Sequence, residues 1–228
     1  MGKTVILTGS PTRFGEDHFT EDNGLLAEVK AALAAKLAAR LTETQNTLPV
    51  GWHAVKKAMN PADANRLEAG PRAECGGPAG PRVLLVSAAP DDRGFTDYVL
   101  ESMTECIRKS GIEPAAVTML DRRNAARAAG LVRSADWIVL CGGHVPTQNR
   151  FLHEIRLKEL LKDFDGLIMG CSAGSMNCAE RVYSHPELPG ESTAPRWLEG
   201  LGLTTRQIVP HYDQVRHAEV DGKRLFEV

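Results

Sequence analysis

The chain alternates short apolar runs with longer segments of helical periodicity. Each apolar run is rich in β-branched and aliphatic residues and leads into a glycine or proline turn, a pattern typical of a parallel α/β sheet. We predict five strands, at Thr4–Leu7, Val83–Val86, Ala116–Met119, Trp137–Leu140 and Leu167–Met169. The apolar stripes between them predict helices over Leu25–Leu41, Thr96–Lys109 and Arg150–Leu161. In an open sheet of this kind, ligands bind beyond the carboxyl ends of the strands.

Two segments break this rhythm. Residues 42–81 contain five prolines and the glycine-rich run Cys75–Gly80, so we predict an irregular insertion with one short helix around Pro61–Leu67. Ser184–Arg196 holds three further prolines and is a candidate wall for a site. The remaining pattern predicts a single α/β domain over residues 1–228.

Composition and charge exclude several classes of protein. The 228 residues include 27 basic and 29 acidic side chains, a net charge of -2, so there is no general positive field for nucleic acid. No apolar run approaches the ~18 residues of a membrane span. We therefore expect no nucleic-acid partner and no membrane association.

The cysteines and histidines indicate neither disulfides nor a metal. The 5 cysteines form no C-x-x-C pair, and their odd number cannot close fully into disulfides, which favours the reduced cytoplasm. There is no H-E-x-x-H motif and no clustered Cys/His ligand set. We expect no cofactor.

The sharpest chemical signal lies where the last predicted strand meets a helical pattern. Gly170-Cys171-Ser172-Ala173-Gly174 reads G-x-S-x-G, the signature of a nucleophile elbow. Small flanking residues are needed because a strand that turns sharply into a helix leaves no room for a Cβ. Ser172 would then project from the carboxyl edge of the sheet, and the N–H of Ala173 would face a developing oxyanion. Cys171, one position before the apex, should point into the protein.

A serine nucleophile needs a second oxyanion donor and a base. The strand ending at Leu140 continues into a glycine pair, and the N–H of Gly143 can approach a substrate oxygen closely because no side chain obstructs it. Among 7 histidines, His211 is the best placed, because the segment Leu203–Tyr212 reads as a further strand whose end is fixed by a proline just before the imidazole. His144 and His185 are alternatives.

In these motifs the chain resembles the peptidase E and cyanophycinase family of serine peptidases. The segments that carry the resemblance are Leu7–Pro11, Gly142–Gly143 with Pro146–Asn149, Gly170–Gly174 and Pro210–Tyr212. The resemblance implies a flavodoxin-like three-layer sandwich with a mostly parallel sheet, as in class I glutamine amidotransferase-like domains. It also implies Ser172 as nucleophile, His211 as general base, and Gly143 with Ala173 as the oxyanion hole.

The chain departs from the family in two places. The glycine pair is commonly followed by asparagine, where this chain has His144. The sequence ends 17 residues after His211, where family members usually continue, so we expect it to be a fragment or a shortened variant. The triad acid is therefore open. Glu187, 15 residues after Ser172, occupies a position that holds an acid in peptidase E-like sequences; Asp213 and Glu180 are alternatives, as is a residue beyond Val228.

These residues predict a cytoplasmic serine peptidase, a monomer or homodimer, that hydrolyses small peptides through an acyl-enzyme. The resemblance implies a dipeptidase that prefers aspartate before the scissile bond, for which Arg150 and Arg181 are unassigned candidate cations. Two other hypotheses compete. One is an amidotransferase-like glutaminase that uses Cys171, and the other is a catalytically silent binding or scaffold protein on the same fold.

Overall fold

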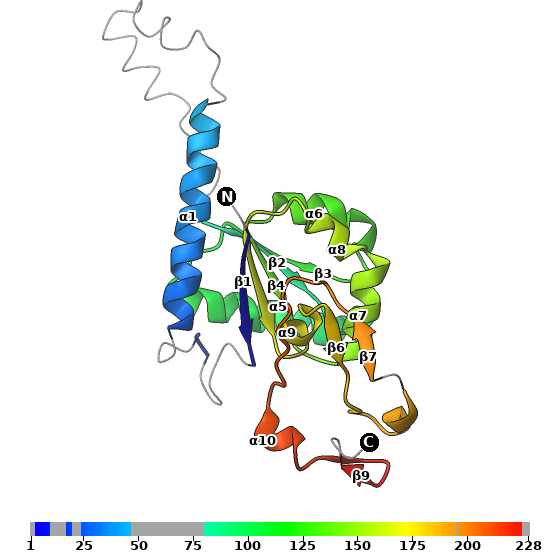
Figure 1. The fold of residues 1–228 in the computed structure, drawn as a ribbon. Helices are drawn as coiled ribbons and strands as arrows, with labels where there is room; N and C mark the ends of the chain where they lie inside the picture. Colours follow the sequence, from blue (N-terminus) through cyan, green and yellow to red (C-terminus); the bar gives the residue numbers. More distant parts are fainter. Residues whose placement is uncertain (1–2, 10–16, 20–23, 47–79, 195, 225–228) are drawn as a thin grey trace, which may run out of the picture.

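The computed structural model describes residues 3–9, 17–19, 24–46, 80–194 and 196–224 (Figure 1). The short helix predicted around Pro61–Leu67 lies outside these residues, as does most of the predicted insertion. The boundary predicted at Thr42 is wrong, because helix α1 (Leu25–Asn46) continues through it. No glycine or proline interrupts the chain between Leu41 and Asn46, so nothing there ends the helix.

The centre of the protein is a parallel sheet of five strands. The strands are β1 (Thr4–Thr8), β2 (Arg82–Val86), β3 (Ala116–Leu120), β4 (Trp137–Leu140) and β5 (Leu167–Cys171). They lie in the order β1-β5-β4-β2-β3, and all the paired neighbours are parallel. All five strands predicted for the central sheet are present, with ends that differ by at most two residues. The α/β class and the mostly parallel sheet are thereby confirmed.

Helices cover both faces of the sheet and make the fold a three-layer sandwich (Figure 1). Successive residues of β2 point to opposite faces, so Leu85 packs in a core cluster with α1 and α5 (Arg93–Lys109). Leu84 packs in a second cluster with α6 (Ala128–Ser134), α7 (Val145–Glu154) and α8 (Leu157–Leu160). Strands β4 and β5 are buried at every position. Burial on both faces explains why these strands read as continuous apolar runs rather than alternating ones.

The helices differ from the sequence prediction at their ends. Helix α5 begins at Arg93 rather than Thr96, because the Asp92 carboxylate caps it by accepting from Phe95 N at 2.9 Å. The single helix predicted over Arg150–Leu161 is two helices. The shorter helices on this side are α6 (Ala128–Ser134), α7 (Val145–Glu154) and α8 (Leu157–Leu160). Arg156 has a φ of 55°, a left-handed conformation that cannot continue an α-helix.

Beyond β5 the chain forms small elements at one end of the sheet. These are α9 (Ala173–Asn177), β6 (Arg181–Tyr183), a 3-10 turn at Glu191–Thr193, β7 (Trp197–Glu199), α10 (Tyr212–Val215), β8 (Glu219–Val220) and β9 (Lys223–Arg224). Strands β6 and β7 pair with each other, as do β8 and β9.

The strand predicted over Leu203–Tyr212 is wrong. Only Thr204 forms a bridge, with Ala179. The backbone of this segment is instead tied to the residues after α9: Leu203 N donates to Cys178 O at 2.8 Å, and Thr204 O accepts from Glu180 N at 3.0 Å. The sequence of a segment does not reveal which part of the chain its backbone will hydrogen-bond. Here the partner is the turn after α9 rather than a neighbouring strand.

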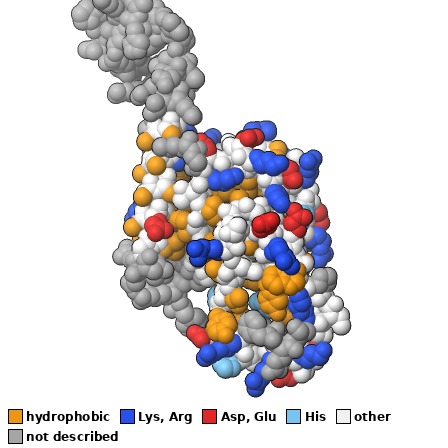
Figure 2. Space-filling view, viewed as in Figure 1, with side chains coloured by type: hydrophobic (Ala, Val, Ile, Leu, Met, Phe, Trp, Pro, Cys, Tyr) orange, Lys and Arg blue, Asp and Glu red, His pale blue; other side chains and the backbone are white. Residues whose placement is uncertain are grey.

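Charged side chains of both signs are interspersed over the face of the molecule seen in Figure 2. Within the described part of the chain, no helix is long and apolar enough to cross a membrane.

Candidate active site

The turn between β5 and α9 is a sharp elbow with Ser172 at its apex. Ser172 has a φ of 49° and a ψ of -112°, which is unusual for a residue with a Cβ. The glycines on either side leave no room for side chains: a Cβ on Gly170 would lie 2.6 Å from Ser175 Cα, and one on Gly174 would overlap the carbonyl oxygen of Leu140. The G-x-S-x-G pattern therefore produces the strained turn that it predicts.

A buried serine fixes this elbow to the end of β1. The hydroxyl of Ser175 lies 2.7 Å from Thr8 O and 2.6 Å from Gly170 O, and it accepts from Thr8 N at 3.0 Å. Ser172 N also donates to Thr8 O, at 2.9 Å. Sequence reasoning missed Ser175, because two of its three partners are backbone atoms of Thr8, in a strand at the other end of the chain.

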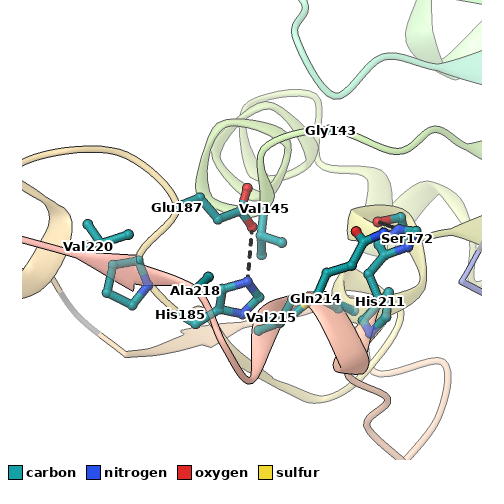
Figure 3. Close-up of a pocket in the computed structure, with 13 residues that line it drawn as sticks. Gly143, Val145, Ser172, His185, Glu187, His211, Gln214, Val215, Ala218 and Val220 are labelled. Atoms are coloured by element: carbon teal, nitrogen blue, oxygen red, sulfur yellow. Dashed lines mark hydrogen bonds and ion pairs between the residues drawn. The ribbon is translucent and has the colours of Figure 1, made fainter. Parts of the chain in front are cut away.

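His211 lies next to Ser172. Its Nε2 is 3.2 Å from Ser172 Oγ, within hydrogen-bond reach (Figure 3). His211 has a φ of 55° and directly precedes α10, so a turn, rather than the end of a predicted strand, orients the imidazole. The preceding Pro210 is buried, while His211 itself is exposed.

The candidate acids lie elsewhere. Glu187 Oε1 is 3.6 Å from Nε2 of His185, and Asp213 pairs with Arg216 at 3.6 Å with its side chain 88% exposed. Glu180 is exposed beyond the end of α9. In the described ranges, no carboxylate forms an ion pair with His211. The structure thus brings Ser172 and His211 together without Glu187.

Burial changes the protonation of the His185–Glu187 pair. It lowers the pKa of His185, with a further contribution from the positive charge of Arg196, and it raises the pKa of Glu187. Both shifts favour the uncharged forms. Figure 3 shows this pair apart from Ser172 and His211, along the wall of the same cavity.

Two cavities meet at the Ser172–His211 contact. The smaller, about 300 Å³, extends past His185 and Glu187 towards α10. The larger, about 620 Å³, extends towards α5. Gly143, Ser172 and His211 line both. A peptide carbonyl at this junction would have space on either side of it.

The predicted oxyanion donors lie beside this junction. Gly143 has a φ of 147°, and a Cβ there would lie 2.8 Å from the Ala88 Cβ, so only glycine fits. Ala173 is buried as the first residue of α9. The chain departs from the family at the next residue, His144, whose Nε2 is 2.9 Å from Glu191 Oε1.

Cys171 does not have the properties of a nucleophile. Its side chain is part of the core under α1 and α5, and burial raises the pKa of its thiol well above the usual range. Burial also raises the pKa of Cys141 to about 12. A buried neutral thiol is a packing residue. Among the described residues, no group of three or more His, Cys, Asp or Glu side chains could hold a metal ion.

Solved structures that are similar to this chain include two whose names describe them as peptidases. A peptidase from an acI-B1 Actinobacterium superposes with a TM-score of 0.54 at 17% identity, over 92% of this chain and 68% of that one. A putative peptidase E protein from Listeria monocytogenes EGD-e gives a TM-score of 0.46 at 19% identity, over 59% of this chain and 68% of that one. No curated protein matches the sequence. The first of these likenesses shows that the chain shares its α/β fold with that solved structure.

The family itself follows from the sequence. The model of peptidase family S51 matches residues 72–224, about two thirds of the chain. The chain belongs to peptidase family S51, which confirms the family that the motifs indicated. The protein is accordingly a peptidase and a hydrolase.

Proposed function

We propose that the protein is a serine peptidase that hydrolyses small peptides through an acyl-enzyme. The observation that carries this proposal is the 3.2 Å contact between Ser172 Oγ and His211 Nε2. A serine hydroxyl is a weak nucleophile unless a base within hydrogen-bond reach removes its proton. The elbow that exposes Ser172, and membership of a peptidase family, support the same assignment.

In the proposed mechanism, His211 takes the Ser172 proton as Oγ attacks the substrate carbonyl. The N–H groups of Gly143 and Ala173 stabilise the resulting oxyanion. His211 then returns the proton to the leaving amine, and the C–N bond breaks to leave an ester on Ser172. A water molecule, deprotonated by His211, hydrolyses that ester and restores the free serine.

The assignment of Glu187 as the triad acid stays a prediction. A triad acid holds the histidine in its productive tautomer and stabilises the imidazolium. Glu187 contacts His185 instead, although Glu187 and His211 line the same cavity. For Glu187 to act as the triad acid, its carboxylate would have to leave the imidazole of His185 and contact that of His211. We further propose that the chain forms one cytoplasmic domain that acts as a monomer or homodimer.

Alanine variants at the elbow test the nucleophile. We expect Ser172→Ala to abolish labelling by a fluorophosphonate probe, read by intact mass, and to lower kcat by at least about 10³-fold. Cys171→Ala, the matched control one residue away, should retain labelling and hydrolysis. Loss of activity in the cysteine variant alone would favour the glutaminase hypothesis. A wild-type protein that neither labels nor hydrolyses peptides would instead be a silent binding protein.

Aspartyl dipeptides are the first substrates to test, because the family resemblance implies them. Recognition of the aspartate carboxylate calls for a cation, but Arg181 stacks on Trp197 at 4.7 Å, and neither Arg181 nor Arg150 lines either of the two cavities that meet at Ser172. Among the described residues that line the two cavities there is no lysine or arginine. We therefore propose that aspartate is accepted without strong selection.

The comparison of Asp-Leu with the uncharged, similarly shaped Asn-Leu measures this selection. We expect their kcat/KM values to differ by less than about tenfold, because a hydrogen-bonding site without a paired cation distinguishes the two poorly. Ala-Leu serves as a control for side-chain size. A preference for Asp-Leu of about 10³-fold or more would contradict this expectation and would require a cation outside the described residues.

A further inference from the structure

His144 contacts a neighbouring side chain at each of its ring nitrogens, through a hydrogen bond at Nδ1 and an ion-pair contact at Nε2. Its Nδ1 lies 2.8 Å from Thr147 Oγ1 on the first turn of α7, and its Nε2 lies 2.9 Å from Glu191 Oε1. His144 directly follows Gly143, the proposed oxyanion glycine, and its backbone caps α7. The position of this imidazole is therefore linked to that of the Gly143 N–H.

The other oxygen of the same carboxylate organises the segment Ser184–Ala194, which we call the cavity loop. Glu191 Oε2 accepts from Glu187 N at 2.9 Å and from Leu188 N at 3.0 Å. These bonds close the turn that carries Glu187, which with His185 and Pro186 lines the smaller cavity. Glu191 thus contacts the oxyanion side and the cavity loop at the same time.

The cavity loop has a second external anchor on its far side. The Asp221 carboxylate accepts from Gly190 N at 2.9 Å and from Ser192 N at 3.2 Å. Asp221 lies at the turn between β8 and β9, away from α7. On the α7 side, the contact between Glu191 and His144 joins the described part of the loop to the residue that follows Gly143.

We infer that His144 and Glu191 form a positioning pair that holds the cavity loop close to the turn after β4, which carries Gly143. The pair would thereby keep a fixed distance between the cavity wall that the loop forms and the Gly143 N–H. The inference rests on the proposed function of this site. Neither residue touches the reacting atoms. Their side chains are 21% and 23% exposed, so the contact is partly shielded from water, and an electrostatic contact is stronger there than at the open surface.

A double-mutant cycle tests the pair. His144→Phe keeps a ring and removes both nitrogens, whereas Glu191→Gln keeps an oxygen for the amides of Glu187 and Leu188 and removes the charge. Because both changes break the His144–Glu191 contact, we expect each to raise KM for a hydrolysed dipeptide several-fold, up to about tenfold, and the double variant to resemble His144→Phe alone. Independent, multiplying effects would overturn the inference. His153→Phe, the same substitution at the exposed end of α7, is the control.

Amide hydrogen exchange measures the coupling between His144 and the cavity loop without any substrate. We expect faster exchange in a peptide covering residues 185–192 in His144→Phe, although His144 lies outside that peptide, with an unchanged thermal midpoint. Unchanged exchange there would overturn the inference whatever the kinetics. Fluorophosphonate labelling of each variant shows whether Ser172 is still activated. If the wild type labels and hydrolyses nothing, the proposed function fails, while the exchange result still decides whether the two residues are coupled.

Discussion

The backbone at Ser172 has a φ of 49° and a ψ of -112°, a conformation that costs about 1–3 kcal/mol for a residue with a Cβ. The surrounding contacts hold it there: Ser172 N is bonded to Thr8 O, and the chain on either side of the serine is glycine-flanked. By holding the backbone in this strained conformation, these contacts keep the Ser172 hydroxyl at the edge of the sheet, where a base can reach it.

Gly174 makes this conformation possible, and its replacement should destabilise the whole domain. A Cβ at Gly174 would overlap the Leu140 carbonyl oxygen, so we expect Gly174→Ala to lower the free energy of unfolding by about 3 kcal/mol. Gly130, within α6, has open space around it, and Gly130→Ala should raise stability by about 0.5–1 kcal/mol. Urea unfolding measures both. Equal effects would mean that close packing at the elbow is not what requires glycine.

Among the residues of the site, the sequence predicts those that belong to a local motif. It does not predict those whose partners lie far away along the chain. Ser172 and the turn around it follow from five consecutive residues. The sequence also predicts that His211 lies next to Ser172, as the structure shows, although the prediction depends on a strand that does not form. Ser175 and Glu191 left no signal, because their partners, Thr8 O and the His144 ring, lie far away in the sequence.

At the scale of elements, burial made the strands easy to predict. Strands β4 and β5 are apolar throughout because both of their faces are covered, and such runs are visible in the sequence alone. Helix ends were harder. The break at Arg156 needs a left-handed residue that carries no marker such as glycine or proline, so two short helices looked like one.

The cavity loop shows a different limit. Its prolines predicted irregular structure, and the only regular element among its described residues is the 3-10 turn at Glu191–Thr193. Irregular backbone must still satisfy its polar groups, and here side chains do so: Glu191 and Asp221 accept from its amides, and Arg196 Nη2 donates to Ser192 O at 2.6 Å. Such pairings depend on loop conformation and follow no periodic pattern that a sequence could display.

For the whole molecule, parallel strands gather the end of β5 and the turn after β4 at one edge of the sheet, and the late segments 184–194 and 210–220 close over that edge (Figure 1). The site therefore depends on a loop and a short helix that are tied down by polar contacts, more than on the apolar core. Conditions that alter those polar groups should affect this end of the molecule first.

Acidification should be such a condition, because His185 is buried there. Burial, together with Arg196, lowers the pKa of His185 in the folded protein, so the unfolded chain, with an imidazole pKa of about 6.5, binds a proton that the folded protein resists. The unfolded state then holds more protons below that pH, and the stability contributed by neutral His185 is lost as the pH falls through about 6.5. Glu187 works in the opposite direction, since burial raises its pKa and favours proton uptake by the folded state.

The two contributions are separated by a variant that cannot titrate at position 185. We expect the thermal midpoint of the wild type to fall more between pH 7.5 and 5.5 than that of His185→Asn, so the two curves converge on acidification. His217→Asn, at an exposed histidine after α10, is the control and should keep the wild-type slope. If His185→Asn lost stability in parallel with the wild type over this range, proton binding by the cavity histidine would not limit the stability of this end of the fold.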